Sequence, residues 1–285
     1  MKPLTYTHVY VIESLKPGES KTGTMLYNDI IKRQMERNGK GNNCELIEVQ
    51  SKTELVRALY KISTIAITDL ANPVIHLEMH GHVDGIQLAS GEMVTWAFLQ
   101  VLLVQINGIC GNNLLITMAT CKGAYLFNTM QPDFRSPMWG FVGPFIDVNA
   151  QEILDSYTAF YEIFLTQNTY SKPEDFKDAI DALNRANATS ASNFHFYKTE
   201  EIMFKTYENY RTYHLTPERI KERAEEILMD LKSHPEFSNY SDAEIKSLAA
   251  IIMLKEDKNL HKDFVHRFFM IDKFPEHAQY YDALK

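Results

Sequence analysis

The residues of this sequence that best suit chemistry are a histidine and a cysteine, each placed directly after an apolar run. His80 follows the segment VIHLEM, and Cys121 follows the segment LLITMAT. The functional crevice of an open parallel sheet lies beyond the carboxyl ends of its strands, so two such side chains on neighbouring strands, about 4.8 Å apart, converge. A cysteine near an imidazole can form a thiolate that attacks a carbonyl carbon, while the imidazole protonates the leaving amine.

The glycine after His80 suits the same chemistry. Because it has no side chain, Gly81 lets a substrate approach the backbone closely. Its N–H and the N–H of Cys121 are predicted to bind the oxyanion of a tetrahedral intermediate. Together these residues predict acyl transfer at a strand edge, with His80 as general acid and base and Cys121 as nucleophile.

Each of these residues also has an ordinary structural interpretation. A single histidine at a strand end is often only a polar boundary residue, and a free cysteine is often a small buried apolar residue. The order of the pair, the flanking strands and the glycine together favour catalysis. Cys44 and Cys110 are interpreted as structural, and His76 and Glu78, which share a face of an alternating strand, as packing or hydrogen-bonding residues.

The elements that must position the pair alternate between strand and helix patterns. This alternation predicts βαβ units and a doubly wound, mainly parallel α/β sheet in the first half of the chain. A hairpin is predicted around Ser90–Gly91, before a helix. The predicted strands cover 7–15, 44–50, 72–80, 114–121 and 138–148, the last interrupted at Gly143–Pro144. The predicted helices cover 24–37, a segment after the S-x-x-E cap of Ser51, 96–106 and 150–167.

The second half of the chain, from about residue 170, has an almost wholly helical pattern. Thr216 followed by Pro217 predicts one helix start, and Ser241 with Glu244 predicts another. We therefore expect two parts: a sheet domain over 1–169 and a mostly helical extension over 170–285. The extension is expected to regulate, to bind a partner or to complete the core.

Composition narrows the classes of function. The chain has 285 residues, 45% hydrophobic and 23% charged, which is enough to bury a full core. A formal net charge of -8 argues against nucleic acid as a ligand, because proteins that bind it carry basic surfaces. No uncharged apolar run approaches the span of a bilayer, and three cysteines are too few for a disulfide framework. We expect a soluble, cytoplasmic protein that binds no membrane.

The blocks VIHLEMHG and LLITMATCKGAY resemble the His-Gly and Cys blocks of the caspase-like cysteine peptidases. In this chain, as in that family, the base precedes the nucleophile and each follows an apolar strand. The spacing between the two is close to the roughly 50 residues found in caspases. The intervening GIQLASGEMVTWAFLQVL is similar to the hairpin and helix of the bacterial CHAT branch, and Cys121-Lys122-Gly123 is similar to the Cys-x-Gly of caspases. The resemblance covers roughly residues 7–165.

The resemblance implies a caspase-like fold and a cysteine endopeptidase that acts on a protein or peptide and needs no metal or organic cofactor. It also implies latency until an activating partner, a ligand or a cleavage orders the substrate loops. Bacterial members often serve defence or programmed death, so the resemblance implies such a role.

Two departures concern substrate preference. Caspases have Gln-Ala before the cysteine where this chain has Ala119-Thr120, and metacaspases place an aspartate at the position of Ala119 to recognise basic side chains. The arginines with which caspases hold an aspartate match no motif here. Lys122 and Arg135 lie near the cysteine in the sequence and are candidates for binding an acidic substrate side chain.

Two other classes of function stay open. The segment HGHVDG, with His82, resembles the H-x-H-x-D-H signature of the zinc-binding metallo-β-lactamase fold, although Gly85 replaces its last histidine. Further ligands would have to come from His195 or His214. The third possibility is the same sheet with a catalytically silent site, used as a binding platform.

Overall fold

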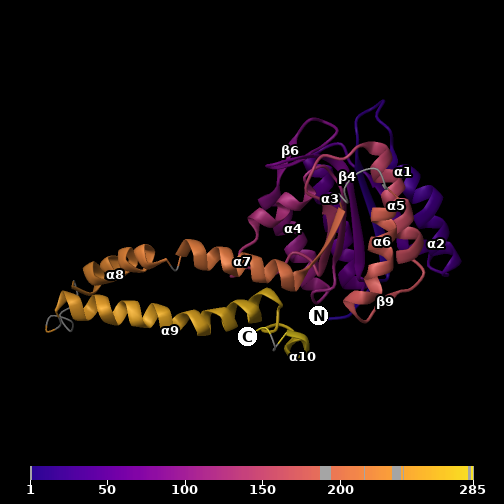
Figure 1. The fold of residues 1–285 in the computed structure, drawn as a ribbon. Helices are drawn as coiled ribbons and strands as arrows, with labels where there is room; N and C mark the ends of the chain where they lie inside the picture. The colour runs from indigo at the N-terminus through magenta and orange to yellow at the C-terminus, as the bar shows by residue number, and fades with distance from the viewer. Residues whose placement is uncertain are drawn as a thin grey trace. The chain divides into compact units, whose positions relative to one another are not determined.

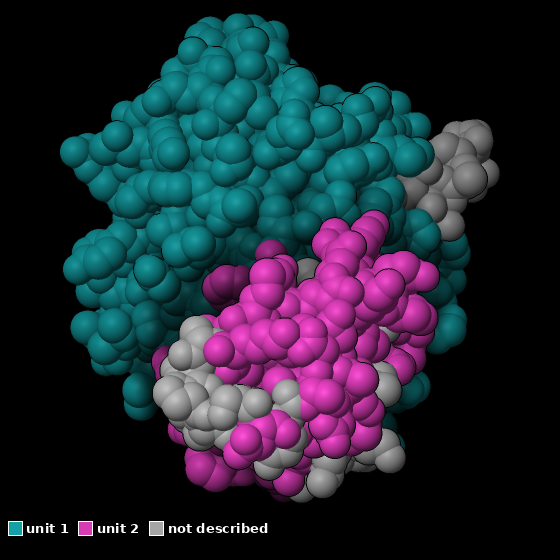
Figure 2. All heavy atoms as spheres, turned by 90° about the vertical axis from the view of Figure 1, so that its left-hand side faces the viewer, with its two compact units in different colours: residues 1–130, 135–202 teal, residues 131–134, 203–285 magenta. Residues whose placement is uncertain are grey.

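The computed structural model describes residues 2–186, 194–214, 216–232, 239, 241–281 and 284. The chain divides into two compact units, which are coloured separately in Figure 2. One comprises residues 1–130 and 135–202, and the other comprises residues 131–134 and 203–285. The predicted domain boundary between residues 169 and 170 therefore lies inside the first unit.

An eight-stranded mixed sheet forms the centre of the first unit (Figure 1). Along its main path the strand order is β3, β2, β4, β7, β8 and β10; the first five are parallel, and β10 is antiparallel to β8. The α/β class and the mainly parallel sheet are thus confirmed. The strands of this path are β2 (His8–Ser14), β3 (Cys44–Glu48), β4 (Pro73–His82), β7 (Leu115–Ala119), β8 (Gly140–Pro144) and β10 (Phe194–Lys198).

The predicted hairpin forms beyond the carboxyl end of β4. β5 (Gly85–Gln87) is antiparallel to the end of β4, and β6 (Met93–Thr95) is antiparallel to β5. Gly91 has a φ of 89° in the turn between them, a backbone conformation that glycine adopts without strain. A separate small sheet pairs β1 (Leu4–Thr5) with β9 (Thr169–Tyr170).

Helices flank both faces of the main sheet, so its strands are nearly continuous apolar runs. α3 (Lys52–Thr68) and α4 (Trp96–Ile109) lie on one face in Figure 1. On the other face, α5 (Ala150–Phe164) and α6 (Lys177–Arg185) share a buried core with β2 and β4. Val11, Val74, Phe160, Leu183 and Phe194 are all in this core.

The helix predicted over 24–37 forms as three consecutive segments. These are α1 (Thr22–Leu26), a π-helical turn (Tyr27–Ile31) and α2 (Lys32–Arg37). Side chains cap helices α3, α4 and α5. Ser51 accepts a hydrogen bond from the Glu54 N–H, which confirms the predicted helix start. The 3-10 turns of this unit are Gly41–Asn43, Gly123–Thr129 and Pro173–Phe176.

Two predictions about the chain after residue 138 were incomplete. The predicted strand 138–148 ends at Pro144 and does not resume, because proline donates no ladder hydrogen bond. The segment from about residue 170 has an almost wholly helical pattern, but Phe194–Lys198 is strand β10. Pairing with β8 and burial of Phe194 and Phe196 against α6 stabilise this strand, and neither contact is visible in a local pattern.

The second unit is mostly helical in its described residues. Its helices are α7 (Thr199–His214), which begins in the first unit, α8 (Pro217–Lys232), α9 (Asp242–Phe268) and α10 (Ala278–Tyr281), with a 3-10 turn at Pro275–His277. The predicted starts are confirmed: Thr216 accepts a hydrogen bond from the Arg219 N–H, and Ser241 forms a capping box with Glu244. No helix in the described parts of the chain is both long and apolar enough to cross a bilayer.

Candidate active site

The strand register brings His80 and Cys121 to the same edge of the sheet. β4 and β7 are parallel neighbours, and Glu78 pairs with Ala119. His80 lies two residues beyond that pair on β4, and Cys121 lies two residues beyond it in the turn that follows β7. Both predicted catalytic residues therefore lie at the carboxyl edge of the sheet.

The topology of the sheet also changes direction at this edge. The chain adds β3 on one side of β2 and then adds β4 on the other side, so β2 and β4 flank a switch point. Ligands of open α/β sheets bind outside the carboxyl ends of the strands at such a point. The loop after β2, residues 15–21, borders this crevice and brings Glu19 to His80.

Gly81 is in close contact with the backbone that carries the cysteine. A Cβ atom added to Gly81 would lie 1.8 Å from the carbonyl oxygen of Cys121 and 2.5 Å from Cγ2 of Thr120. No real Cβ atom approaches backbone so closely, so a side chain at this position would push the two strand ends apart. Glycine is required here because it allows the His-Gly and Cys segments to touch.

The hydrogen-bond alternation of the hairpin bears on the predicted oxyanion donors. The Leu88 N–H donates to the carbonyl of Glu92 across the hairpin. Hydrogen-bonded pairs alternate along antiparallel strands, so the N–H and C=O of Ile86, two residues earlier, also point toward β6. Gly81 is opposite Ile86 across β4 and β5 and therefore forms no hydrogen-bonded pair with it. The Gly81 N–H faces away from β5.

His80 bonds to a carboxylate. Its Nε2 lies 3.0 Å from Oε1 of Glu19, and the two side chains are 45% and 34% exposed. The other oxygen of that carboxylate accepts a hydrogen bond of 2.7 Å from the Lys16 N–H. The imidazole is thus held by one of its two nitrogens at the mouth of the crevice.

Cys121 bonds to the segment that follows β8. Its Sγ lies 3.4 Å from the N–H nitrogen and 3.5 Å from the carbonyl oxygen of Val148, just before α5. Among the described residues, the thiol and the imidazole of His80 make hydrogen bonds to these separate partners and not to each other. In this arrangement the thiol is held by the backbone of the segment that precedes α5.

The electrostatic surroundings keep the thiol protonated. Burial raises the pKa of Cys121, and the nearby carboxylate of Asp147 raises it further. The Val148 N–H and the Lys122 ammonium act in the opposite direction but do not prevail. In this conformation Cys121 is therefore a thiol at neutral pH and not a preformed thiolate.

Lys122 lies at the site but is already paired. It has a left-handed backbone with a φ of 56°, and its N–H donates to the carbonyl of Ile146. Its Nζ lies 3.2 Å from Oδ1 of Asp147. A substrate carboxylate that binds Lys122 would therefore have to share the ammonium with Asp147 or displace it.

The structure does not bring Arg135 to the site. The next residue, Ser136, accepts a hydrogen bond from Nδ2 of Asn107, and Oδ1 of the same amide accepts the Leu114 N–H at the amino end of β7. Cys121 follows the carboxyl end of β7. The prediction for Arg135 relied on its nearness to Cys121 in the sequence. Between these two residues the chain returns to the amino end of β7, so they lie at opposite ends of that strand.

A buried polar network lies under the site on the same face of β4. Nδ1 of His76 lies 2.8 Å from Oγ1 of Thr117, and its Nε2 lies 3.2 Å from Oε2 of Glu78. The Thr22 hydroxyl donates to the other oxygen of Glu78. Tyr161 completes the network through Thr117. The interpretation of His76 and Glu78 as hydrogen-bonding residues is confirmed.

The HGHVDG segment forms a turn. His82 is the last residue of β4, opposite Gly85, and the carbonyls of Val83 and Asp84 accept hydrogen bonds from Trp96. His195 is on β10, paired with Gly143. Across the described residues, no three His, Cys, Asp or Glu side chains are grouped so that they could hold a metal ion. The donor set that the zinc hypothesis needs is not assembled there.

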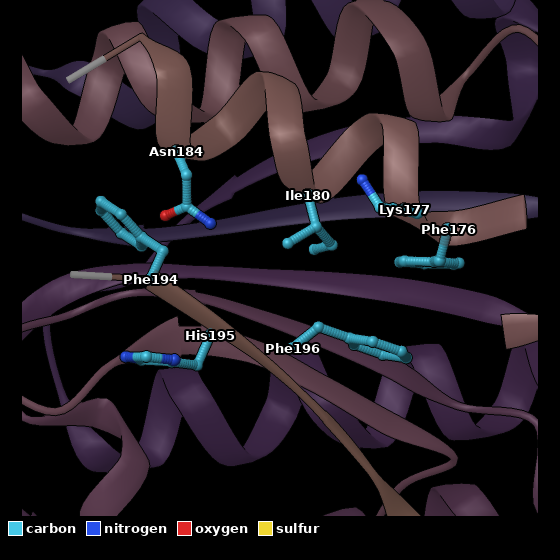
Figure 3. Close-up of a pocket in the computed structure, with 7 residues that line it drawn as sticks. All are labelled: Phe176, Lys177, Ile180, Asn184, Phe194, His195 and Phe196. Carbon is cyan, nitrogen blue, oxygen red and sulfur yellow. The ribbon is translucent and has the colours of Figure 1, made fainter. Parts of the chain in front are cut away.

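A separate cavity of about 290 Å³ lies between α6 and β10 (Figure 3). Its walls are mostly aromatic and aliphatic, and Oδ1 of Asn184 is buried without a hydrogen-bond partner. It opens beside β10, which β8 separates from β7 in the sheet. The cavity therefore lies apart from Cys121. Its lining residues are Phe176, Lys177, Ile180, Asn184, Phe194, His195 and Phe196.

Sequence reasoning missed Glu19 and Asp147 as neighbours of the site. Both follow strands that end at the carboxyl edge: Glu19 follows β2, and Asp147 follows β8. The rule that located His80 and Cys121 could have drawn attention to these loops. It could not have identified which loop side chain turns toward the crevice.

Comparison with models of known protein families finds no match for this chain, and a search of curated proteins also finds no match.

Proposed function

We propose that this protein is a caspase-like cysteine endopeptidase that is latent in the conformation described here. The observation that carries the proposal is the placement of the two residues: His80 lies near the end of β4, and Cys121 lies in the turn that follows the neighbouring parallel strand β7, at the edge where such sheets bind ligands. The contact of Gly81 with Cys121, which leaves no room for a side chain, supports the same assignment.

The proposed reaction has two steps. In the first, the thiol proton of Cys121 passes to His80, and Sγ forms a bond to the carbonyl carbon of the substrate while the π electrons move to oxygen. Collapse of this intermediate breaks the C–N bond, and the imidazolium protonates the leaving amine. In the second, His80 takes a proton from water, which attacks the thioester and releases the carboxylic acid product and the thiol.

The Gly81 and Cys121 amides are the proposed donors to the oxyanion. The turn of the Gly81 N–H away from β5 supports this role, because that donor is not used by the hairpin. Donors of this kind act on charge that develops only during the reaction.

Latency follows from the state of the thiol. Cys121 is protonated and bonded to Val148, so turnover requires Sγ to leave Val148 and approach the imidazole. We propose that an activating partner or ligand moves the segment 145–148. A protein or peptide is the substrate class, and the engagement of Lys122 by Asp147 gives no support for an acidic side chain at the cleavage point.

The test is cleavage of a fluorogenic peptide library by the full chain, combined with the rate at which iodoacetamide alkylates Cys121. We expect cleavage to be lost in both Cys121→Ala and His80→Ala and kept in Cys44→Ala. We also expect any peptide or partner that activates cleavage to speed the alkylation of Cys121 in the wild type but not in His80→Ala. Cleavage that survives Cys121→Ala, or activated cleavage with no change in the alkylation rate of Cys121, would contradict the proposal.

A binding platform is the second candidate, and the storage of the thiol against Val148 favours it. In a catalytically silent site, the Cys121 thiol would stay bonded to Val148 permanently. The platform would gain support if a partner protein bound equally to the wild type, to Cys121→Ala and to His80→Ala, and if that complex left the alkylation rate of Cys121 unchanged.

A further inference from the structure

We infer that Glu19 is a positioning residue that fixes the tautomer of His80 and presents its Nδ1 to Cys121. The inference rests on the proposed function, since it assigns a third member to the His80 and Cys121 pair. The juxtaposition that carries it is the 3.0 Å contact between Oε1 of Glu19 and Nε2 of His80.

The carboxylate of Glu19 is held in place by its own loop. Its Oε2 accepts the Lys16 N–H at 2.7 Å, and the Glu19 N–H donates to the Lys16 carbonyl at 3.2 Å. Slight burial raises the pKa of Glu19, but the hydrogen bonds from Lys16 and His80 outweigh it and leave the pKa below its ordinary value. Glu19 is thus a charged acceptor with both oxygens in use.

Both ends of the loop are anchored to the sheet. At the end of the loop, Nζ of Lys21 donates to the Leu15 carbonyl at 2.8 Å and lies 3.7 Å from the buried carboxylate of Glu13. The Thr24 N–H and hydroxyl also donate to Glu13. Before the loop, the Ser14 hydroxyl donates to the Val49 carbonyl. A loop that is anchored at both ends can hold the Glu19 carboxylate in a fixed position next to His80.

The chemistry of the pair determines the tautomer. A carboxylate can only accept, so Nε2 of a neutral His80 must carry the proton, and its lone pair is then on Nδ1. Nδ1 is the nitrogen left to accept a proton from Cys121, whose backbone touches Gly81 beside it. Glu19 would also stabilise the imidazolium formed when the thiol gives up its proton, as an orienting carboxylate does in other triads.

The first test reads the tautomer directly and needs no substrate. The full chain is labelled with ¹⁵N-histidine, and the His80 signals are assigned by their loss in His80→Ala. We expect the wild type to show a protonated Nε2, Glu19→Ala to shift toward a mixture of tautomers, and Glu19→Gln to keep the wild-type pattern, because its amide oxygen still accepts. Glu48→Ala, an exposed glutamate at the end of β3, is the matched control.

The second test measures the catalytic effect. We expect Glu19→Ala to lower kcat roughly 10- to 100-fold with little change in KM, the usual range for a residue that orients another, and Glu19→Gln to restore part of the loss. A His80 tautomer that is the same in Glu19→Ala and wild type would overturn the inference. If the tautomer responds as expected but the peptides that the wild type cleaves are also cleaved by Cys121→Ala, the Glu19 assignment stands and the peptidase proposal fails.

Discussion

Two histidine–glutamate contacts on one face of β4, four residues apart along the strand, differ in how deeply they are buried. His76 contacts Glu78 at 3.2 Å, and the two side chains are 0% and 3% exposed. His80 contacts Glu19 at 3.0 Å, and both side chains reach solvent. The residue types and distances are nearly the same, so the difference must come from the surroundings.

The buried pair has no nitrogen left for chemistry. Both ring nitrogens of His76 have partners, and the rings of Tyr157 and Tyr161 pack edge-on against it. In the exposed pair, Nε2 of His80 is held, and the proposed function gives Nδ1 to Cys121. A histidine–glutamate pair therefore stabilises the fold where it is buried, and in the proposed function it serves catalysis where it reaches solvent.

The largest expected effect is on activity, through the exposed pair. We expect His80→Ala to lower kcat/KM roughly 10³-fold or more, because it removes both the base and the acid of the proposed reaction. Its free energy of unfolding should change by only about 0.5 kcal/mol, as is usual for an exposed position. Peptide cleavage and urea unfolding of the same preparation check both parts. A large loss of stability would mean that the comparison between the two pairs is wrong.

The buried pair should show the opposite pattern. We expect His76→Ala to lower the free energy of unfolding by about 3 kcal/mol or more, because it leaves a cavity and removes a partner of the buried Glu78. Urea unfolding followed by circular dichroism measures this. Alkylation of Cys121 in the folded variant should match the wild type, and a stability loss below that of His80→Ala would contradict the distinction.

An intermediate effect is expected where the two strand ends touch. Gly81→Ala places a methyl group against the Cys121 carbonyl, so we expect a loss of about 1–3 kcal/mol in the free energy of unfolding and a changed alkylation rate of Cys121. Gly108→Ala is the matched control, because an added Cβ there meets nothing within 4 Å and the site is in helix α4. Equal behaviour of the two variants would contradict the contact.

The smallest expected effect concerns the thiol. Asp147 raises the pKa of Cys121, so Asp147→Asn should lower that pKa, increase the thiolate fraction at pH 7.5 and speed alkylation roughly two- to fivefold. Lys122→Gln should act in the opposite direction, because the Lys122 ammonium lowers the same pKa. The pH dependence of iodoacetamide modification, followed by mass spectrometry, measures both variants. A slower reaction in Asp147→Asn would reverse the assigned sign.

Much of the sheet and the central pair of the site were predictable because their signals are local. Strands β2, β3, β4 and β7 are apolar runs bounded by turns, and the caps at Ser51, Thr216 and Ser241 lie within three residues of the groups they bind. The edge rule for parallel sheets then placed His80 and Cys121 together without any coordinates.

The sequence by itself determined which strands form, in what order the candidate base and nucleophile follow them, and that a glycine lies between the base and the hairpin. Only the tertiary structure decided that β10 completes the sheet, that Arg135 lies at the far end of β7, that Glu19 holds His80 and that Val148 holds the Cys121 thiol. These facts depend on how distant loops return to the sheet edge. Such returns are set by packing between segments remote in the chain, which no local pattern of residues records.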